Sequence, residues 1–168
     1  MEKIMWLVLG MATFVAALRA GKSRRAMYLG RAALGALFIA FGAVVNAIYL
    51  AMGSDYYAHF ADSSPFRFVR DTWQSLVLPH QVLFISLLII FELTVGVLIL
   101  SGGRRTQVGL LGLIGFHIGQ FAFGGVLWPW ATVMLVALVL LLRAERRQPS
   151  TPTTLQIRRP RHPSDIPA

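Results

Sequence analysis

Cysteine is absent from the 168 residues, and acidic residues are scarce, with 7 Asp and Glu against 16 Lys and Arg. Without a thiol, the chain has no disulfide exchange, thiolate catalysis, iron–sulfur ligation or cysteine-containing zinc site of its own. The sequence also contains no Ser-x-x-Lys, Gly-x-Ser-x-Gly, His-Glu-x-x-His or phosphate-loop motif. These absences exclude the enzyme classes that such motifs mark, and any redox role needs a borrowed cofactor.

Charge of either sign is also sparse, at 14% of residues, whereas 56% of residues are hydrophobic. The charges fall in short stretches between long apolar runs, which is typical of an integral membrane protein. The runs lack the alternation of a barrel strand, and backbone in lipid must satisfy its own hydrogen bonds. We therefore expect an all-α fold, a membrane helical bundle.

Five apolar runs approach the ~20 residues that a helix needs to cross a bilayer. They form one predicted bundle over residues 1–147. The predicted multi-pass arrangement has transmembrane helices at about 4–20, 32–53, 82–101, 108–127 and 129–146.

The connections between these runs carry further signals. Trp128-Pro129-Trp130 predicts a turn at the membrane surface, because proline removes a backbone donor and tryptophan favours that surface. Between Pro65 and Pro79, apolar and charged residues interleave, which predicts a short interfacial helix in the outer loop. From 148 to 168 the composition is Pro-rich and basic, which predicts a disordered tail.

Basic residues indicate the orientation. They gather at 19–31, at 102–107 and after 142, whereas the connection at 54–79 contains three aspartates. Because cytoplasmic loops are enriched in Lys and Arg, we expect the N-terminus outside and the C-terminus in the cytoplasm of a bacterial inner membrane. The net charge of +9 is thus interpreted as a topology signal. We expect the chain to contact membrane lipid and not to bind nucleic acid.

Glu92 is the acid placed deepest in an apolar run, at the middle of 82–101. A charge at the bilayer centre costs about 2.5–3.5 kcal/mol on insertion scales, so such a group is usually partnered, neutralised or functional. His117 lies at the middle of 108–127, at the same predicted depth on the next, antiparallel helix. We expect a Glu92–His117 hydrogen bond inside the bundle, and the sequence leaves the ionisation state of Glu92 open.

Other polar residues share the faces of these helices. At ~100° per residue, Arg31, Asn46 and Tyr49 lie on one face of their helix, and Gln120 lies one turn after His117. No metal site is expected, and a single histidine at that depth does not provide bis-histidine haem ligation. The candidate buried polar site therefore comprises Glu92, His117, Gln120, Asn46, Tyr49 and Arg31.

Two short motifs resemble a known family. Arg31-Ala-Ala-Leu-Gly opens one helix, and Phe91-Glu-Leu-Thr-Val-Gly continues through Leu-Ser-Gly-Gly into basic residues. Over about residues 28–127 the chain resembles the DoxX-like membrane proteins. The resemblance implies a bundle of typically four spans and a role beside thiosulfate–quinone oxidoreductase or redox-protective enzymes. The apolar run at 4–18 is an addition to the family pattern.

Two interpretations of the candidate site stay open at this point. In one, the polar residues hydrogen-bond a quinone-like ring, and the protein is an accessory or quinone-proximal subunit of a membrane redox system, with redox-enzyme subunits as partners and no intrinsic cofactor. In the other, the polar residues only join helices, at about 0.6–2 kcal/mol per hydrogen bond, as in a structural or assembly subunit. A small-molecule or proton permease is a third class, although no internal repeat is visible. The oligomeric state is also open.

Overall fold

The computed structural model describes residues 2–53 and 55–147, where all regular secondary structure is helical. This confirms the predicted all-α class. One long helix is continuous from α2 through a π-helical stretch, η1, into α3. The long helices are α1 (Glu2–Ala20), α2–η1–α3 (Arg24–Ala36, Leu37–Val44, Val45–Ala51), α5 (Gln81–Ser101), α6 (Gly103–Gln120) and α7 (Leu127–Arg146).

Three of these helices are long and apolar enough to cross a membrane, namely Arg24–Ala51, Gln81–Ser101 and Leu127–Arg146. Ile4–Ala20 is apolar but shorter. Helix α6 is less apolar, because it carries Arg104 and Arg105 as well as several glycines. The structure thus has three candidate spans and a shorter apolar helix, and five spans stay a prediction.

Helix α5 has two faces of different character. Its inward face is buried and includes Glu92, Val95, Gly96 and Ile99. Its outward face consists of large apolar side chains that are roughly half exposed or more, as lipid contact requires. These side chains are Val82, Leu83, Leu87, Ile90, Leu93, Val97 and Leu100.

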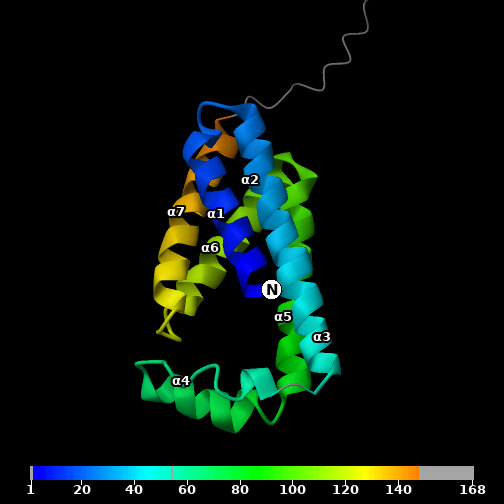
Figure 1. Cartoon of the computed structure of the whole chain (residues 1–168), viewed down its shortest axis with the longest axis vertical. Helices are drawn as coiled ribbons and strands as arrows, with labels where there is room; N and C mark the ends of the chain where they lie inside the picture. The colour runs from blue at the N-terminus through cyan, green and yellow to red at the C-terminus, as the bar shows by residue number, and fades with distance from the viewer. Residues whose placement is uncertain (1, 54, 148–168) are drawn as a thin grey trace, which may run out of the picture.

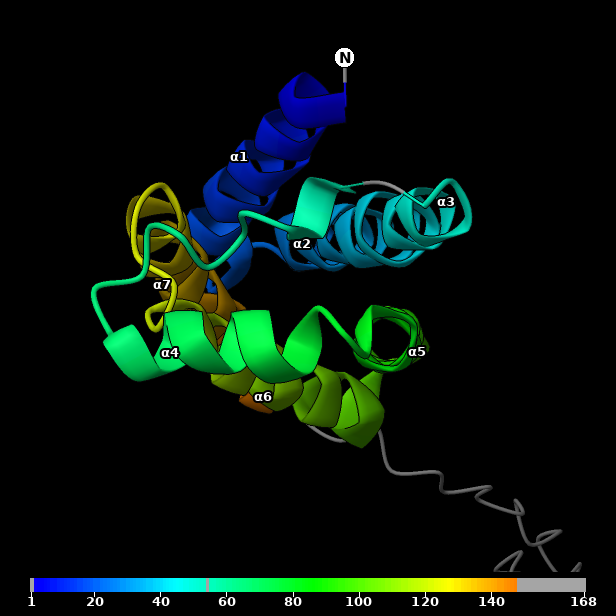
Figure 2. The same cartoon turned by 90° about the horizontal axis from the view of Figure 1, so that it is seen from below.

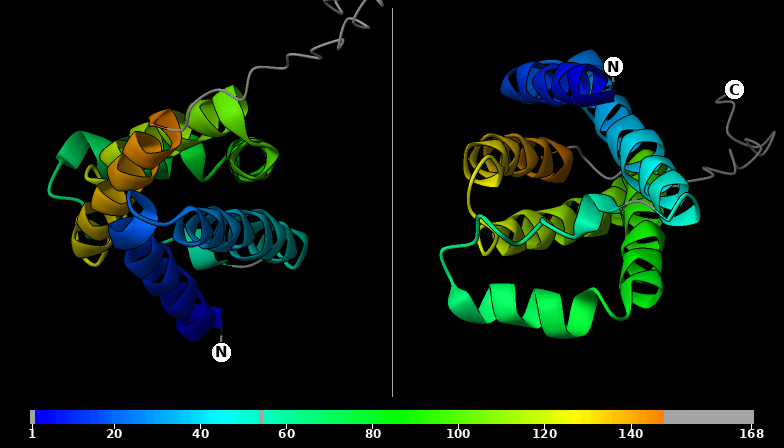
Figure 3. Two further views of the ribbon diagram at one scale, coloured as in Figure 1. Left: turned by 90° about the horizontal axis from the view of Figure 1, so that it is seen from above. Right: turned by 60° about the horizontal axis from the view of Figure 1, so that its bottom comes forward.

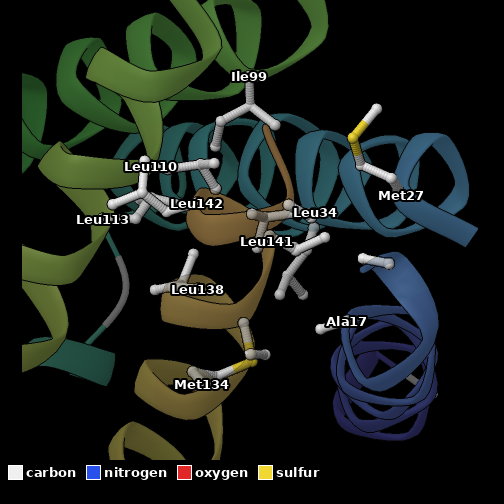
Figure 4. Packing of buried hydrophobic residues seen from close by; sticks show 14 of the residues in the cluster. Ala17, Met27, Leu34, Ile99, Leu110, Leu113, Met134, Leu138, Leu141 and Leu142 are labelled. Carbon is white, nitrogen blue, oxygen red and sulfur yellow. The ribbon is translucent and has the colours of Figure 1, made fainter. Parts of the chain in front are cut away.

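The apolar core lies where α2, α5, α6 and α7 meet (Figure 4). Leu34, Leu110 and Leu138 are completely buried there. Gly109 lets α6 approach α5, because a Cβ at this position would lie 3.0 Å from side-chain atoms of Ile99. Small residues at helix contacts of this kind allow close packing between membrane helices.

The two ends of the bundle differ. The α1–α2 connection, the α5–α6 junction and the end of α7 lie together at one end (Figure 1), and the basic connections predicted for the cytoplasmic side belong to these segments. Figures 2 and 3 show α4 (Arg67–Thr72) crossing the opposite end, and the π-helical η3 (Trp73–Val77) continues it. The predicted short helix between Pro65 and Pro79 is thereby confirmed as a helix.

The turn before α7 lies earlier than predicted. Helix α6 ends at Gln120, and the chain turns over 121–126, where Gly124 and Gly125 have φ values of 71° and 57°. Pro129 is instead inside the first turn of α7. A proline is tolerated there because the first N–H groups of a helix have no intrahelical acceptor to lose. The predicted tail at 148–168 lies outside the described residues.

Candidate functional site

A cavity of about 650 Å³ lies in the half of the bundle that carries η3. Its volume is within the range of small-molecule sites. We call it the aromatic cavity, because ten of its lining residues are aromatic. These are Trp6, Phe38, Phe41, Tyr49, Tyr56, Tyr57, Phe60, Trp73, Phe116 and Trp130.

Glu92 lies on the wall of this cavity and is only 5% exposed. Its Oε2 accepts a hydrogen bond from Asn46 Nδ2 at 2.8 Å, and Asn46 Oδ1 accepts one from the Tyr57 hydroxyl at 2.7 Å. The carboxyl group therefore faces the bundle interior, as the depth argument predicted. A chain of two hydrogen bonds links it to the loop after α3.

Glycine at position 42 makes room for this carboxyl group. A Cβ on Gly42 would lie 2.8 Å from both the carboxyl carbon and Oε1 of Glu92. Gly42 and Asn46 are one helical turn apart, so they face Glu92 together. Gly35 packs on Leu100 in the same way one heptad earlier, which confirms that this face of the helix points toward α5.

Of the three residues that these two hydrogen bonds connect, Tyr57 alone lies outside the candidate spans, in η2 (Asp55–Tyr57). Burial is the main cause that raises its pKa to about 12. The hydroxyl is therefore protonated at neutral pH and donates to Asn46, which in turn orients the amide nitrogen toward Glu92. Trp73 Nε1 donates to the Tyr57 carbonyl at 2.9 Å, so η3 is tied to the same loop.

His117 also lines the cavity and is 1% exposed. Its Nδ1 donates to the Leu113 carbonyl at 2.8 Å, and its ring packs edge-on against Phe38 and Phe116. The predicted Glu92–His117 hydrogen bond is wrong. Each side chain finds a nearer partner, His117 on its own helix and Glu92 on Asn46, although both border the same space.

Gln120 and Tyr49 line the cavity as well. Gln120 Oε1 is buried and has no hydrogen-bond partner among the described residues. The Tyr49 ring stacks on Tyr56 with the centroids 4.8 Å apart. Five of the six predicted site residues thus border one cavity.

Arg31 is the exception and lies near the other end of the bundle. Its Nε donates to the Ile99 carbonyl at 2.9 Å and its Nη2 to the Leu100 carbonyl at 3.3 Å, at the end of α5. Its Nη1 forms an ion pair with Glu145 Oε2 at 3.5 Å, and Glu145 Oε1 accepts from Gly103 N. We call this group the Arg31–Glu145 cluster. Glu92 is therefore not the only buried acid, since Glu145 is 7% exposed.

Sequence reasoning did not assign Tyr57 or the aromatic walls to the site. The adjacent tyrosines 56 and 57 were a usable signal, because a tyrosine ring buries a large apolar area and its hydroxyl group finds a hydrogen-bond partner when it is buried. Glu145 gave no such signal, since it stands among Arg143, Arg146 and Arg147 and has the pattern of an ordinary flanking charge.

Within residues 2–53 and 55–147, no group of three or more histidine and acidic side chains is placed to hold a metal ion. No protein-family model, curated protein or solved structure matches the chain.

Proposed function

We propose that the chain is a multi-pass membrane protein that binds a quinone-like ring in the aromatic cavity, as an accessory or quinone-proximal subunit of a membrane redox system. One observation carries the proposal. Glu92, His117 and Gln120 come from two helices and border a single cavity whose other walls are mostly aromatic. A site with a few convergent polar groups in an apolar, aromatic surround suits a planar ring with polar substituents.

The shape of the polar chain supports ligand binding over simple helix joining. Asn46 donates to Oε2 of Glu92 and is itself held by the Tyr57 hydroxyl, which fixes the carboxyl group of a residue that lines the cavity, while Oε1 accepts no hydrogen bond from the described residues. Preorganised polar groups of this kind are what a binding site needs, because the ligand then meets a rigid pattern.

We also propose the membrane arrangement that follows from the charge pattern. In it the chain crosses the bilayer five times, with α6 enclosed between α5 and α7, and the basic connections lie on the cytoplasmic side. The aromatic cavity is then in the outer half of the membrane, and α4 and η3 lie in the outer interface. Relationship to the DoxX-like proteins belongs to the same proposal, on the Arg31–Gly35 and Glu92–Gly96 motifs.

A second candidate is a structural or assembly subunit. The observation that favours it is that the Glu92–Asn46–Tyr57 chain joins α5, α3 and η2, as interhelical polar contacts do in membranes. In this case the cavity is unoccupied packing space, and Glu92 contributes only to stability.

Two buried acids provide a matched test. Glu92→Gln keeps the side-chain shape but removes the carboxylate, and we expect about tenfold weaker binding of a short-chain hydroquinone with little change in thermal stability. Glu145→Gln, the control, disturbs the Arg31–Glu145 cluster, so we expect lower stability and unchanged ligand affinity. The measurements are calorimetric titration and thermal unfolding of the full chain in detergent.

The result that would contradict the proposal is equally specific. If Glu92→Gln lowers thermal stability as much as Glu145→Gln and no quinone or hydroquinone binds to the unaltered protein, the structural role is correct. Copurification from mild detergent, with identification of bound proteins and isoprenoid lipids, tests the subunit role separately.

A further inference from the structure

The polar wall of the aromatic cavity is rich in hydrogen-bond acceptors. Three side chains form it, and each has an acceptor that receives no hydrogen bond from the described residues. They are Glu92 through Oε1, His117 through Nε2 and Gln120 through Oε1.

The hydrogen bonds that each side chain already forms show which of its atoms is the free acceptor. Glu92 Oε2 is already bonded to Asn46, so Oε1 is the free oxygen. His117 Nδ1 must carry its proton, because a carbonyl oxygen such as that of Leu113 only accepts, and Nε2 of the neutral ring is therefore an acceptor. Gln120 Oε1 is buried without a partner.

The cavity's donors lie mainly in its aromatic walls, as the hydroxyl groups of Tyr49 and Tyr56 and the indole N–H groups of Trp6, Trp73 and Trp130, and few belong to the polar wall. The Asn46 amide donates to Glu92 and the Tyr57 hydroxyl to Asn46, so both are committed. Gln120 keeps an uncommitted donor, its Nε2, and Glu92 donates through Oε1 only when its carboxyl group is protonated. No lysine or arginine lines the cavity.

Burying an acceptor without a donor is unfavourable, so the ligand has to supply the donors. A quinone offers only carbonyl oxygens, which would oppose the acceptors of the wall. A hydroquinone offers two hydroxyl groups, and its flat ring suits the aromatic walls equally well. A site built for a donor strongly rejects the analogue that lacks it.

Resting on the function proposed above, we propose that the cavity selects the reduced, hydroxyl-bearing form of the ring, with Gln120 Oε1 and His117 Nε2 as the acceptors that distinguish it from the quinone. The ligand class is thus a membrane-soluble hydroquinone. By linkage, each tenfold preference for the reduced form raises the two-electron midpoint potential of the bound couple by about 30 mV.

The test uses the full chain in detergent, under anaerobic conditions, with empty micelles as the blank. Calorimetric titration compares a short-chain hydroquinone, the corresponding quinone and the bis-methyl ether of the hydroquinone, which has the same ring but no donor. We expect the hydroquinone to bind about tenfold more tightly than either of the others.

A matched pair of variants on α6 assigns the preference. Gln120→Met keeps the length of the side chain and removes both the acceptor Oε1 and the donor Nε2, so the hydroquinone should lose its advantage over the quinone. Gln107→Met is the control, because Gln107 lies on the same helix but does not line the cavity. It should bind all three compounds as the unaltered protein does.

The outcomes separate the two proposals. Equal binding of quinone and hydroquinone to the unaltered protein overturns this inference and leaves the proposed function standing. Binding of none of the three compounds overturns both. A preference that survives in Gln120→Met overturns the role of Gln120. If that variant does not fold, the three-compound comparison on the unaltered protein still decides whether the donor is selected.

Discussion

The two halves of the bundle each bury an acid, but the surroundings of the two acids differ. In the Arg31–Glu145 cluster the carboxyl group meets a guanidinium and a backbone N–H, and the remaining Arg31 donors bind the last carbonyls of α5. In the aromatic cavity Glu92 has one neutral partner and faces open volume. The comparison teaches that burial of a charge does not by itself mark a functional site, whereas an acid beside unfilled space is a candidate for one.

The largest expected effect tests the first half of this comparison. Arg31→Met leaves Glu145 without its counter-charge and the end of α5 without two donors, so we expect the free energy of unfolding to fall by about 3–5 kcal/mol. Denaturant titration of the purified protein measures this. Arg105→Met is the control, because Arg105 is exposed and should change stability by less than about 1 kcal/mol. A similar loss in both variants would mean that the cluster is not specifically stabilising.

The next effect concerns the packing against Glu92. Gly42→Ala places a methyl group 2.8 Å from the Glu92 carboxyl group, which has to move and lose its bond to Asn46. We expect a loss of about 1–3 kcal/mol in the free energy of unfolding, and weaker ligand binding. Gly115→Ala meets no atom within 4 Å, so it should instead stabilise its helix by up to about 1 kcal/mol. If thermal unfolding shows that both alanine variants are destabilised, or that both are stabilised, the steric argument is refuted.

The smallest effect depends on pH. Tyr57→Phe removes the donor to Asn46 and should cost about 1 kcal/mol at neutral pH. Burial raises the folded-state pKa of Tyr57 to about 12 from the usual 10.0. Its contribution is therefore complete below pH 10 and is lost as the pH rises toward 12, because only the unfolded state ionises readily in that interval.

Absorbance titration of tyrosinate measures this effect directly. The unaltered protein should show a late step near pH 12 that Tyr57→Phe lacks. Tyr28→Phe is the control, since Tyr28 is 54% exposed, and it should leave the late step in place. A late step that persists in Tyr57→Phe would show that this hydroxyl is not held as described.

Much of the fold could be predicted, because apolar length and the positions of charges are local properties of the chain. The bounds of α5 agree with the predicted run to within a residue. The turn before α7 could not be located in this way, since Phe121, Ala122 and Phe123 are as apolar as the helix that they leave. Two consecutive glycines with positive φ end the apolar region there, and Pro129 only begins the next helix.

The candidate site was predictable in its members but not in its contacts. Depth correctly brought Glu92 and His117 to the same cavity, yet it gave no information on the bond that each side chain forms. Asn46 was correctly predicted on the helix face that points into the bundle. Tyr57 was not predicted, because it comes from a loop and helical periodicity gives no information on the path of a loop. Arg31 shares a helical face with Asn46 but lies about four turns away along the axis, so the same periodicity placed it in the wrong group.

What the sequence alone determined is the class of the protein: apolar runs with sparse charge dictate helices, and glycine and asparagine at helical spacing dictate the face that meets α5. Only the tertiary structure decided which acid is paired with a guanidinium and which faces a cavity. The physical reason is that hydrogen-bond partners and empty volume depend on several helices at once. No single helix carries that information.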